Sequence, residues 1–550
     1  MALFLFSLSD HVTKVRVKRL IGSILFRLCM TTLFKVILAL LLAIFSVFKS
    51  QAQSVSSVLV DAQTGAPIPY ATLMLKNKKG VISNEEGAFS IELDRAIQAT
   101  DSLYISCMGY SNSRVALSEL KDSLFLHAVE INLKEVIVSN KNYTAAEIVA
   151  KVQEALPRNY PGKLSRKRLF YRASETQQIN RMEAQIKKSS IAEINSALLD
   201  SVLQKIPKTG AYYTEILADL SGDYSKEQQK IEIIKASNLY DKENELSLEG
   251  IEEKFNAIFE ANVKKNSYLK VKSGLFSSKI SSDELFGEEQ AIDSSNSALL
   301  DSIAAAKKKQ ALERKTNFAR YRKNRLARLF SRLPIFEDSP FNFLFKENRY
   351  LISLEDFTYL GTQPVYVLRF ISKGRSDYNA TLYVNADDFA VVRMDYKNNQ
   401  HLSNFKLLGI SYINYLSEGK VFFSKSEALG YELSYLEETT GEKVGVKRPL
   451  KVVEKNKYVK GRRQQNQLKL DFHFEINTQN KNEVVVFSQK PLTEEDYKNT
   501  LEKNEVLPTY LPAYDPDFWK GYNIMAPNQA IKSFSAQGLA PTTISPTDQK

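Results

Sequence analysis

Four short stretches follow one another between residues 58 and 138: VLVDAQTGAPIPYA (58–71), SNEEGAF (83–89), YISCMGY (104–110) and LKEVIV (133–138). In the first, Gly65, Pro67 and Pro69 mark a turn, because Gly permits positive φ whereas Pro fixes φ and lacks an N–H donor. In AFSIEL (88–93) apolar and polar residues alternate, as in a half-buried strand. Short strands separated by turns at this spacing are typical of an all-β sandwich.

In this order the four stretches resemble the carboxypeptidase-regulatory-like domain, a small transthyretin-like β-sandwich common on Gram-negative envelope proteins. One departure is Ser56-Ser57, where a Gly is often expected before the first strand. The resemblance implies a folding and binding unit without chemistry of its own. The same domain opens many TonB-dependent outer-membrane receptors. The residues that follow here are too few for a plug and a 22-stranded barrel at about 10 residues per strand, which argues against a transporter.

The N-terminal residues are predicted to be a targeting segment. Residues 33–48 (LFKVILALLLAIFSVF) are apolar apart from Lys35. This run is shorter than the roughly 20 residues that span a bilayer, and its length suits a signal peptide. We therefore predict a signal peptide over residues 1–53, with Met30 as a possible true start; an uncleaved anchor is the alternative. Only Cys107 follows this segment, so an intrachain disulfide is excluded in the exported chain.

The positive charge is local. The chain has a net charge of +12, and the predicted signal segment carries half of it. Between residues 307 and 332 there are eleven Lys or Arg and one acid, Glu313. Because the charge is concentrated in one segment of an exported chain, we expect no nucleic-acid partner.

Beyond the sandwich (54–139), the pattern predicts a helix-rich region (140–347) that contains the first strands of a second domain. We expect an amphipathic helix over 142–156 that ends before Pro157, a strand over 168–173, helical spacing over 179–205 and again over 250–330, and a polar loop over 262–282.

A sheet region is predicted over 348–490, with strands at 365–370, 382–384, 390–396, 421–435 and 468–476. In the last of these, the odd positions are polar, and the even ones are Leu468, Leu470, Phe472, Phe474 and Ile476. This alternation indicates an antiparallel sheet with one wide apolar face, which needs either helices or a lipid-like ligand to cover it. Residues 491–550 are expected to form a Pro- and aromatic-rich strap and a polar tail.

The predicted fold is therefore mainly β with α+β: a transthyretin-like sandwich followed by a curved antiparallel sheet covered by helices. The second domain is similar in architecture to the half-open barrel of periplasmic lipoprotein carriers. That resemblance implies an apolar cavity plugged by helices.

No residue is assigned to catalysis, to a cofactor or to a metal. His127 and Glu130 have the H-x-x-E spacing of zinc carboxypeptidases, but residues three apart in a predicted strand (125–133) point to opposite faces. His473 falls on the polar face of its strand, and Cys107 is interpreted as a small buried hydrophobe. The carboxylate pairs Glu85-Glu86 and Asp387-Asp388 are expected in turns, and a glycosidase-type pair is the alternative.

The basic segment over 307–332 has two interpretations. Apolar residues recur at helical spacing, among them Phe318, Leu326, Leu329 and Leu333. The basic residues around them are Arg320, Lys323, Arg325 and Arg328. Such a helix either lies on an anionic membrane surface or packs its apolar stripe on the sheet and leaves its charges in solvent, and we favour packing.

We expect an exported, non-catalytic protein of the periplasm or of the periplasmic face of the outer membrane. It would act as a binding or scaffold module for an envelope protein or an apolar, lipid-like ligand. One alternative is an envelope hydrolase that uses carboxylates of the sheet region. The other is a small β protein embedded in the outer membrane.

Overall fold

The computed structural model describes residues 53–75, 80–93, 95–129, 143–241, 254, 257–264, 266–281, 297–360, 363–374, 377–458, 464–503 and 505–535. Within these ranges the chain is mainly β and forms three sheets with few helices. Residues 1–52 of the predicted signal peptide, the stretch LKEVIV (133–138), Glu130 and the polar tail lie outside the described residues.

The N-terminal sandwich (residues 53–129) consists of two sheets, with strand orders β4-β1-β7 and β3-β2-β5-β6. Its elements are β1 (Gln53–Asp61), β2 (Thr72–Leu75), β3 (Gly80–Ile82), β4 (Ala88–Leu93), β5 (Ser102–Ser106), β6 (Ser113–Ala116), η1 (Leu117–Glu119) and β7 (Ser123–Leu126). Leu59 and Phe89 from one sheet share an apolar core with Leu73 and Leu103 from the other. The transthyretin-like arrangement itself stays a prediction.

The turn before β4 explains one of the sequence signals. Gly87 has a φ of +73°, and a Cβ there would lie 2.5 Å from the carbonyl oxygen of Leu59. Glycine is therefore required both by the backbone conformation and by the close approach of β1. The strand predicted over 125–133 is shorter than expected, since β7 ends at Leu126.

The large sheet has the strand order β13-β14-β15-β16-β18-β19-β20-β8-β9-β10-β21, with β17 added to β18 and the β11–β12 hairpin added to β19. Its strands are β8 (Ser165–Ser189), β9 (Thr209–Gly222), β10 (Gln229–Leu239), β11 (Ser267–Ser273), β12 (Phe276–Ser281), β13 (Tyr350–Leu360), β14 (Gln363–Ser372), β15 (Tyr378–Asn385), β16 (Val391–Asn398), β17 (Ser403–Leu407), β18 (Ile410–Ser426), β19 (Gly430–Asn456), β20 (Gln464–Pro491) and β21 (Thr509–Leu511).

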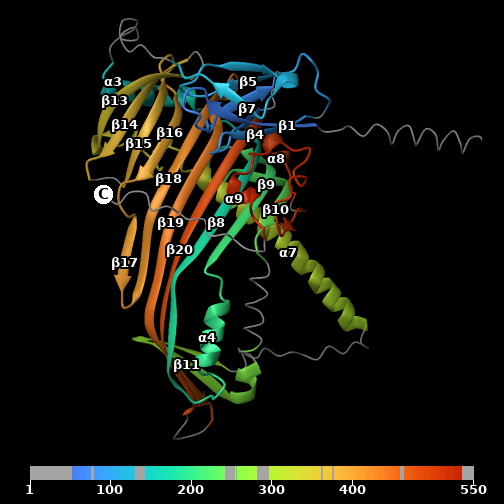
Figure 1. The fold of residues 1–550 in the computed structure, drawn as a ribbon, viewed down its shortest axis with the longest axis vertical. Coiled ribbons are helices and arrows are strands. Elements are labelled where there is room, and N and C mark those ends of the chain that lie inside the picture. The colour runs from blue at the N-terminus through green and yellow to red at the C-terminus, as the bar shows by residue number, and fades with distance from the viewer. Residues whose placement is uncertain are drawn as a thin grey trace, which may run out of the picture.

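Three strands dominate this sheet. β20 pairs antiparallel with β19 on one side and with β8 on the other, in both cases along almost its whole length. β20 has 28 residues, which corresponds to about 90 Å of extended chain. These strands run from beneath the sandwich to the far end of the molecule, where β11 and α4 (Ser196–Lys205) lie (Figure 1).

Several expectations for the second domain are wrong. The helical spacing expected over 179–205 is only partly right, because β8 continues to Ser189 and the helix α4 begins at Ser196. The polar loop expected over 262–282 contains the β11–β12 hairpin. The strand expected over 421–435 is two strands, since the chain turns between β18 and β19. The other four predicted strands of the sheet region are confirmed as parts of β14, β15, β16 and β20.

The helices cover one face of the sheet near the sandwich. They are α3 (Ala145–Asn159) and α7 (Ser297–Phe330), and the short elements are η2 (Glu347–Arg349), α8 (Glu494–Asn499) and α9 (Gln529–Lys532). In the capping box of α3, Thr144 and Glu147 satisfy each other's backbone N–H groups, and the helix includes Pro157 instead of ending before it. No helix among the described residues has both the length and the apolarity to cross a bilayer.

The apolar stripe of α7 packs on the sheet. Leu326, Leu329 and Phe330 are buried in the main core with residues of β8, β19 and β20. Of the four basic residues considered for membrane contact, Lys323 is paired with Glu502 and Arg325 with Glu438. Arg320 and Arg328 are exposed. Two of the four side chains are thus held by carboxylates of this chain, and membrane contact through the four stays a prediction.

A network of buried charges joins the sandwich, the sheet and the C-terminal strap (residues 505–535). Arg172 of β8 is 1% exposed; its Nε lies 2.7 Å from Glu215 Oε1, and its guanidinium donates to the carbonyl oxygen of Met525 in the strap at 2.8 Å. Trp519 Nε1, also in the strap, donates to Glu215 at 2.7 Å. On the same side of the sheet, Lys481 of β20 is paired with Glu85 of the sandwich at 2.7 Å. Every part is thus tied to the sheet through a charged group that needs its partner.

Arg172→Met is expected to destabilise the protein by about 3–5 kcal/mol, because it leaves buried carboxylates without their counter-charge. Thermal melting would measure the loss. The double variant R172M/E215Q should recover part of it. The matched control is Arg168→Met on the same strand: Arg168 is paired with Asp219 at the surface, and its loss should cost less than about 1 kcal/mol. Equal effects of R172M and R168M would contradict a dominant role for the buried network.

The burial of Lys167 can be tested through the pH dependence of the protein's stability. Its side chain is fully buried, and its Nζ donates to Ser165 Oγ at 2.6 Å and to the carbonyl oxygen of Gly222 at 3.1 Å. Burial lowers the pKa of Lys167 from 10.5 to about 8. Between these values the unfolded chain binds the proton more tightly than the folded one, so stability rises with pH in this window. Relative to Lys167→Met, the wild type should gain up to about 3 kcal/mol between pH 8 and 10.5 in denaturant unfolding. A difference between the two proteins that does not change with pH would contradict this.

Candidate functional site

The sheet face that carries α7, here called the helix face, is built from rows of side chains across β8, β20 and β19. Alternate residues of a strand point to the same face, so the register identifies each row. The row Tyr171–Val484–Leu436 belongs to the core under α7. This buried row is the starting point from which the face continues along the strands.

The next three rows form a polar belt. They are Ala173–Asn482–Glu438, Glu175–Asn480–Thr440 and Gln177–Thr478–Glu442. Glu438 in the first row is paired with Arg325 of α7 at 3.4 Å and with Arg332, two residues after α7, at 2.6 Å. The belt therefore separates the core under α7 from the rest of the helix face.

Beyond the belt lie five further rows, here called the apolar rows. They are Ile179–Ile476–Val444, Met182–Phe474–Val446, Ala184–Phe472–Arg448, Ile186–Leu470–Leu450 and Ser189–Leu468–Val452. The aliphatic and aromatic side chains among them are only half-buried, unlike those under α7. Phe472 and Phe474 stack with 6.1 Å between ring centroids. From residue 468 to residue 476 the face extends over about 27 Å, and α4 packs against β8 at this end of the molecule.

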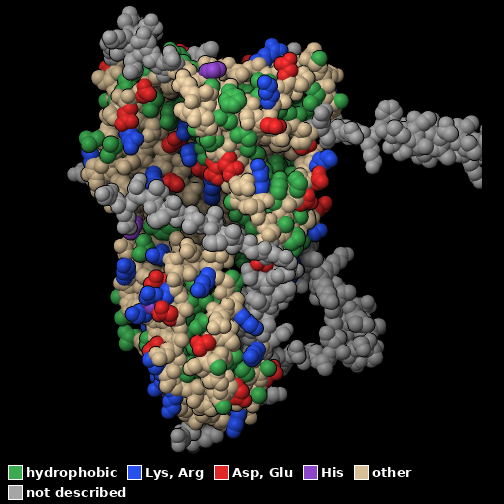
Figure 2. Space-filling view, viewed as in Figure 1, with side chains coloured by type: hydrophobic (Ala, Val, Ile, Leu, Met, Phe, Trp, Pro, Cys, Tyr) green, Lys and Arg blue, Asp and Glu red, His purple; other side chains and the backbone are tan. Residues whose placement is uncertain are grey.

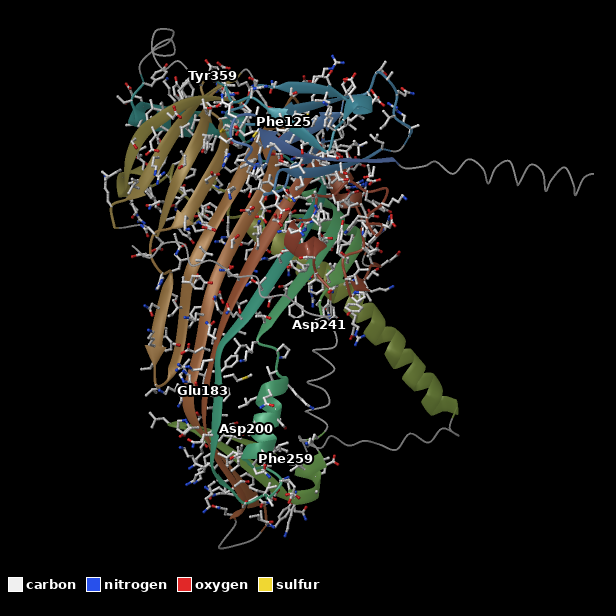
Figure 3. All side chains as sticks on the ribbon, in the orientation of Figure 1. Phe125, Glu183, Asp200, Asp241, Phe259 and Tyr359 are labelled. Carbon is white, nitrogen blue, oxygen red and sulfur yellow. The ribbon has the colours of Figure 1, made fainter. Side chains whose placement is uncertain are left out.

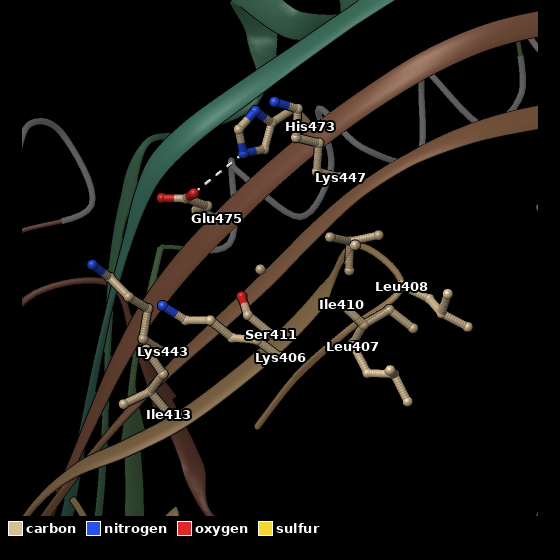
Figure 4. Close-up of a pocket in the computed structure, with 13 residues that line it drawn as sticks. Lys406, Leu407, Leu408, Ile410, Ser411, Ile413, Lys443, Lys447, His473 and Glu475 are labelled. Atoms are coloured by element: carbon tan, nitrogen blue, oxygen red, sulfur yellow. Dashed lines mark hydrogen bonds and ion pairs between the residues drawn. The ribbon is translucent and has the colours of Figure 1, made fainter. Parts of the chain in front are cut away.

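The opposite face of the same strands is polar. Here Lys443, Lys447, His473 and Glu475 line a hollow of about 520 Å³ with the β17–β18 turn (Figure 4). A second hollow of about 470 Å³ adjoins it beside Arg181. Figure 2 shows acidic and basic side chains interspersed over the part of the surface where the long strands run.

His473 lies on this polar face, as the alternation predicts. Its Nε2 lies 3.2 Å from Glu475 Oε1, and its Nδ1 lies 3.9 Å from Glu183 of β8. Glu183 is placed at the same end of the molecule as Asp200 of α4 (Figure 3). Among the described residues neither ring nitrogen of His473 contacts a hydroxyl or a thiol, so the geometry provides no activated nucleophile.

The other candidate residues from the sequence either pair with groups of this chain or lie exposed at the surface. His127 is exposed just beyond β7. Glu85 is paired with Lys481, and Glu86 accepts from the backbone N–H of Gln529 at 2.8 Å. Asp388, in the turn between β15 and β16, is paired with Lys425. No group of three or more His, Cys, Asp or Glu side chains within the described ranges is placed to hold a metal ion.

Cys107 packs against the core of the sandwich, with its Sγ 4.0 Å from the carbonyl oxygen of Pro69. Burial raises the pKa of this thiol to about 11. At neutral pH almost no thiolate is present, and the thiolate is the form that attacks electrophiles.

Comparison with known proteins assigns no family. No family model matches the chain, and no curated protein matches it. Among solved structures, a chain of the Pseudomonas aeruginosa MucA/MucB complex is 7% identical, with a TM-score of 0.15; the alignment covers 60% of this chain and 93% of that one. A Bacteroides fragilis protein of unknown function, described as membrane-associated, is 11% identical, with a TM-score of 0.11; the alignment covers 79% of this chain and 97% of that one. These TM-scores are too low to transfer the fold or the function of either protein.

Native protein should react slowly with iodoacetamide at pH 8. With a pKa of about 11, roughly one thiol in a thousand is ionised, about two orders of magnitude fewer than for a free cysteine. Mass spectrometry of the alkylated protein would follow the rate, with the protein in denaturant as the control. Equal rates in the native and the denatured protein would show that Cys107 is accessible and reactive.

Proposed function

We propose that this is an exported, non-catalytic binding protein of the cell envelope that holds an apolar, lipid-like ligand on the apolar rows of the helix face. The observation that carries the proposal is the change of burial along three continuous strands. The same face is buried under α7 at one end and carries half-buried Leu, Ile, Val and Phe side chains at the other.

Physical chemistry supports a ligand on this surface. Large contiguous apolar patches are rare on soluble proteins and mark binding sites when they occur. Each Å² of apolar surface removed from water stabilises a complex by about 25 cal/mol. The rows extend over about 27 Å, which is long enough to accommodate extended acyl chains. The polar belt at one end is suited to the polar part of an amphiphile.

The envelope location is supported by sequence features. The apolar run over 33–48 is typical of a signal peptide. The resemblance of the sandwich to the carboxypeptidase-regulatory-like domain adds a module that is common on envelope proteins. A non-catalytic role is supported by the partners of the candidate carboxylates Glu85 and Asp388, both of which are engaged in ion pairs within the chain.

A protein partner is the second candidate, and β17 favours it. This strand pairs with β18 alone among the described strands. Three large apolar side chains at its end are about half exposed: Phe405, Leu407 and Leu408. An exposed strand edge with apolar side chains can receive an extended peptide as a further strand. Binding there would leave the apolar rows free for a ligand.

Lipid-directed mass spectrometry on the full-length protein, isolated natively from the envelope, would test the proposed function. We expect a near-stoichiometric acyl-chain lipid with the wild type, and a clear loss with the double variant F472S/F474S, whose changes lie in the apolar rows. His473→Ser, on the opposite face of the same strand, is the matched control and should retain the lipid. Circular dichroism would confirm that all three proteins are folded. A wild type without bound lipid, or equal retention by all three, would argue against a ligand on the apolar rows.

A further inference from the structure

A third hollow lies where α7 meets the polar belt. Its volume is about 340 Å³, and it is lined by residues of β8, β9, α7, β19 and β20. The residues that carry the argument are Thr214, Arg322, Arg325 and Asn482, with Glu175 and Glu442 also lining the hollow. Glu175 and Glu442 belong to the belt rows that lie closer to the apolar rows.

Asn482, which lines this hollow, has an unused donor. Its side chain is 3% exposed. Its Oδ1 accepts from the Tyr171 hydroxyl at 2.8 Å and from Arg325 Nε at 3.2 Å, and these two donors fix which atom of the amide is the oxygen. The Nδ2 is buried and has no acceptor among the described residues. A buried donor without a partner is unfavourable, so its retention calls for an acceptor that the described chain does not supply.

Arg322 presents a second unused donor. Its Nε is buried without an acceptor in the described part of the chain. Its guanidinium donates to Thr214 Oγ1 at 3.2 Å and lies over the rings of Phe318 and Tyr321, at 5.2 and 5.1 Å. Nearby cations are neutralised by carboxylates, for example Lys323 by Glu502, whereas within the described residues Arg322 takes part in no ion pair. Its charge is held in place by packing and is available to an anion.

We infer that this hollow is a headgroup site, in which Arg322 and Asn482 bind the phosphate of an amphiphile whose acyl chains lie on the apolar rows. The inference rests on the proposed function, and it adds the chemical class of the ligand. Two buried N–H donors and a guanidinium charge match the oxygen atoms of a phosphate. The belt places this anion between the core under α7 and the apolar rows.

Two carboxylates that line the hollow further narrow the chemical class of the proposed ligand. Glu175 accepts from Gln177, and Glu442 is hydrogen-bonded to the Tyr412 hydroxyl. Both would repel an isolated anion but attract an ammonium group one or two rows from the phosphate. The arrangement therefore favours a zwitterionic phospholipid, with its phosphate on Arg322 and its ammonium toward Glu175 and Glu442, over a lipid of net negative charge.

Calorimetric titration of full-length protein with a short-chain phosphatidylethanolamine tests the inference. We expect Arg322→Gln and Asn482→Asp each to weaken binding by about 10- to 100-fold, because each removes a hydrogen bond to a charged group. Asn482→Asp keeps the acceptor for Tyr171 and Arg325, but it replaces the N–H donor by a carboxylate oxygen whose negative charge also repels the phosphate. Arg328→Gln, at an exposed position of the same helix, is the matched control and should bind as the wild type does. Melting curves would confirm that the variants are folded.

Parallel titrations separate the headgroup site from the proposed function. A monoacylglycerol of the same chain length should bind the wild type about 10-fold or more weakly than the phospholipid and should be insensitive to Arg322→Gln. If the wild type binds both amphiphiles equally, or if both variants bind the phospholipid as the wild type does, the headgroup site is wrong while the apolar rows still bind. If neither amphiphile binds, the proposed function fails. Inorganic phosphate that binds in an Arg322-dependent way, without any binding of the phospholipid, would assign the hollow to free phosphate and overturn the inference.

Discussion

The arrangement of the three parts of this protein depends on the pairing of Arg172 with Glu215 beneath the C-terminal strap. A guanidinium buried to this degree is tolerated only with a carboxylate and further acceptors around it. The carboxylate comes from β9, and the carbonyl oxygens of Met525 and Ala526 in the strap complete the set. On the same side of the sheet, Lys481 brings in the sandwich through Glu85. The position of each part is therefore fixed by a shared set of charges, since Arg172 also lies 3.9 Å from Glu483, and Lys481 also pairs with Glu437 and Glu483 at 3.3 and 3.4 Å.

The long strands β8, β19 and β20 connect this region to a surface whose apolar side chains are only half-buried. Near the sandwich, both faces of β8, β19 and β20 are covered, one by α7 and the main core, the other by Trp519 and the strap. Farther along, the described residues cover neither face of these strands to that extent. Because the strands are continuous, the well-packed end holds the register of the half-buried end. A pre-formed apolar surface reduces the conformational entropy that a ligand must overcome on binding.

Sequence patterns predicted the structural features that depend on residues close together in the chain. The turns of the sandwich, the alternation over 468–476 and the apolar stripe that ends in Leu333 all follow from periodicity and turn residues. The helical expectation over 179–205 failed for its first part, 179–189, for a specific reason. A bulge at Asn180 shifts the register of β8 against β20, so Ile179, Met182 and Ile186 follow each other at helical intervals inside a strand. The hollow at the belt was not predictable, since Asn482 meets Tyr171 and Arg325 only through the tertiary fold.

The pairing of β8 with β20 also has a consequence for how the chain reaches its folded state. Tyr171 and Asn482, which are hydrogen-bonded across these strands, are 311 residues apart in the sequence. Contacts of such long sequence separation form slowly, because a large loop must be closed before they contribute. The centre of the sheet therefore forms only after nearly all of the chain is available. Until then, the edge of β8 that later pairs with β20 is open to aggregation, and an exported chain would depend on holding chaperones during this interval.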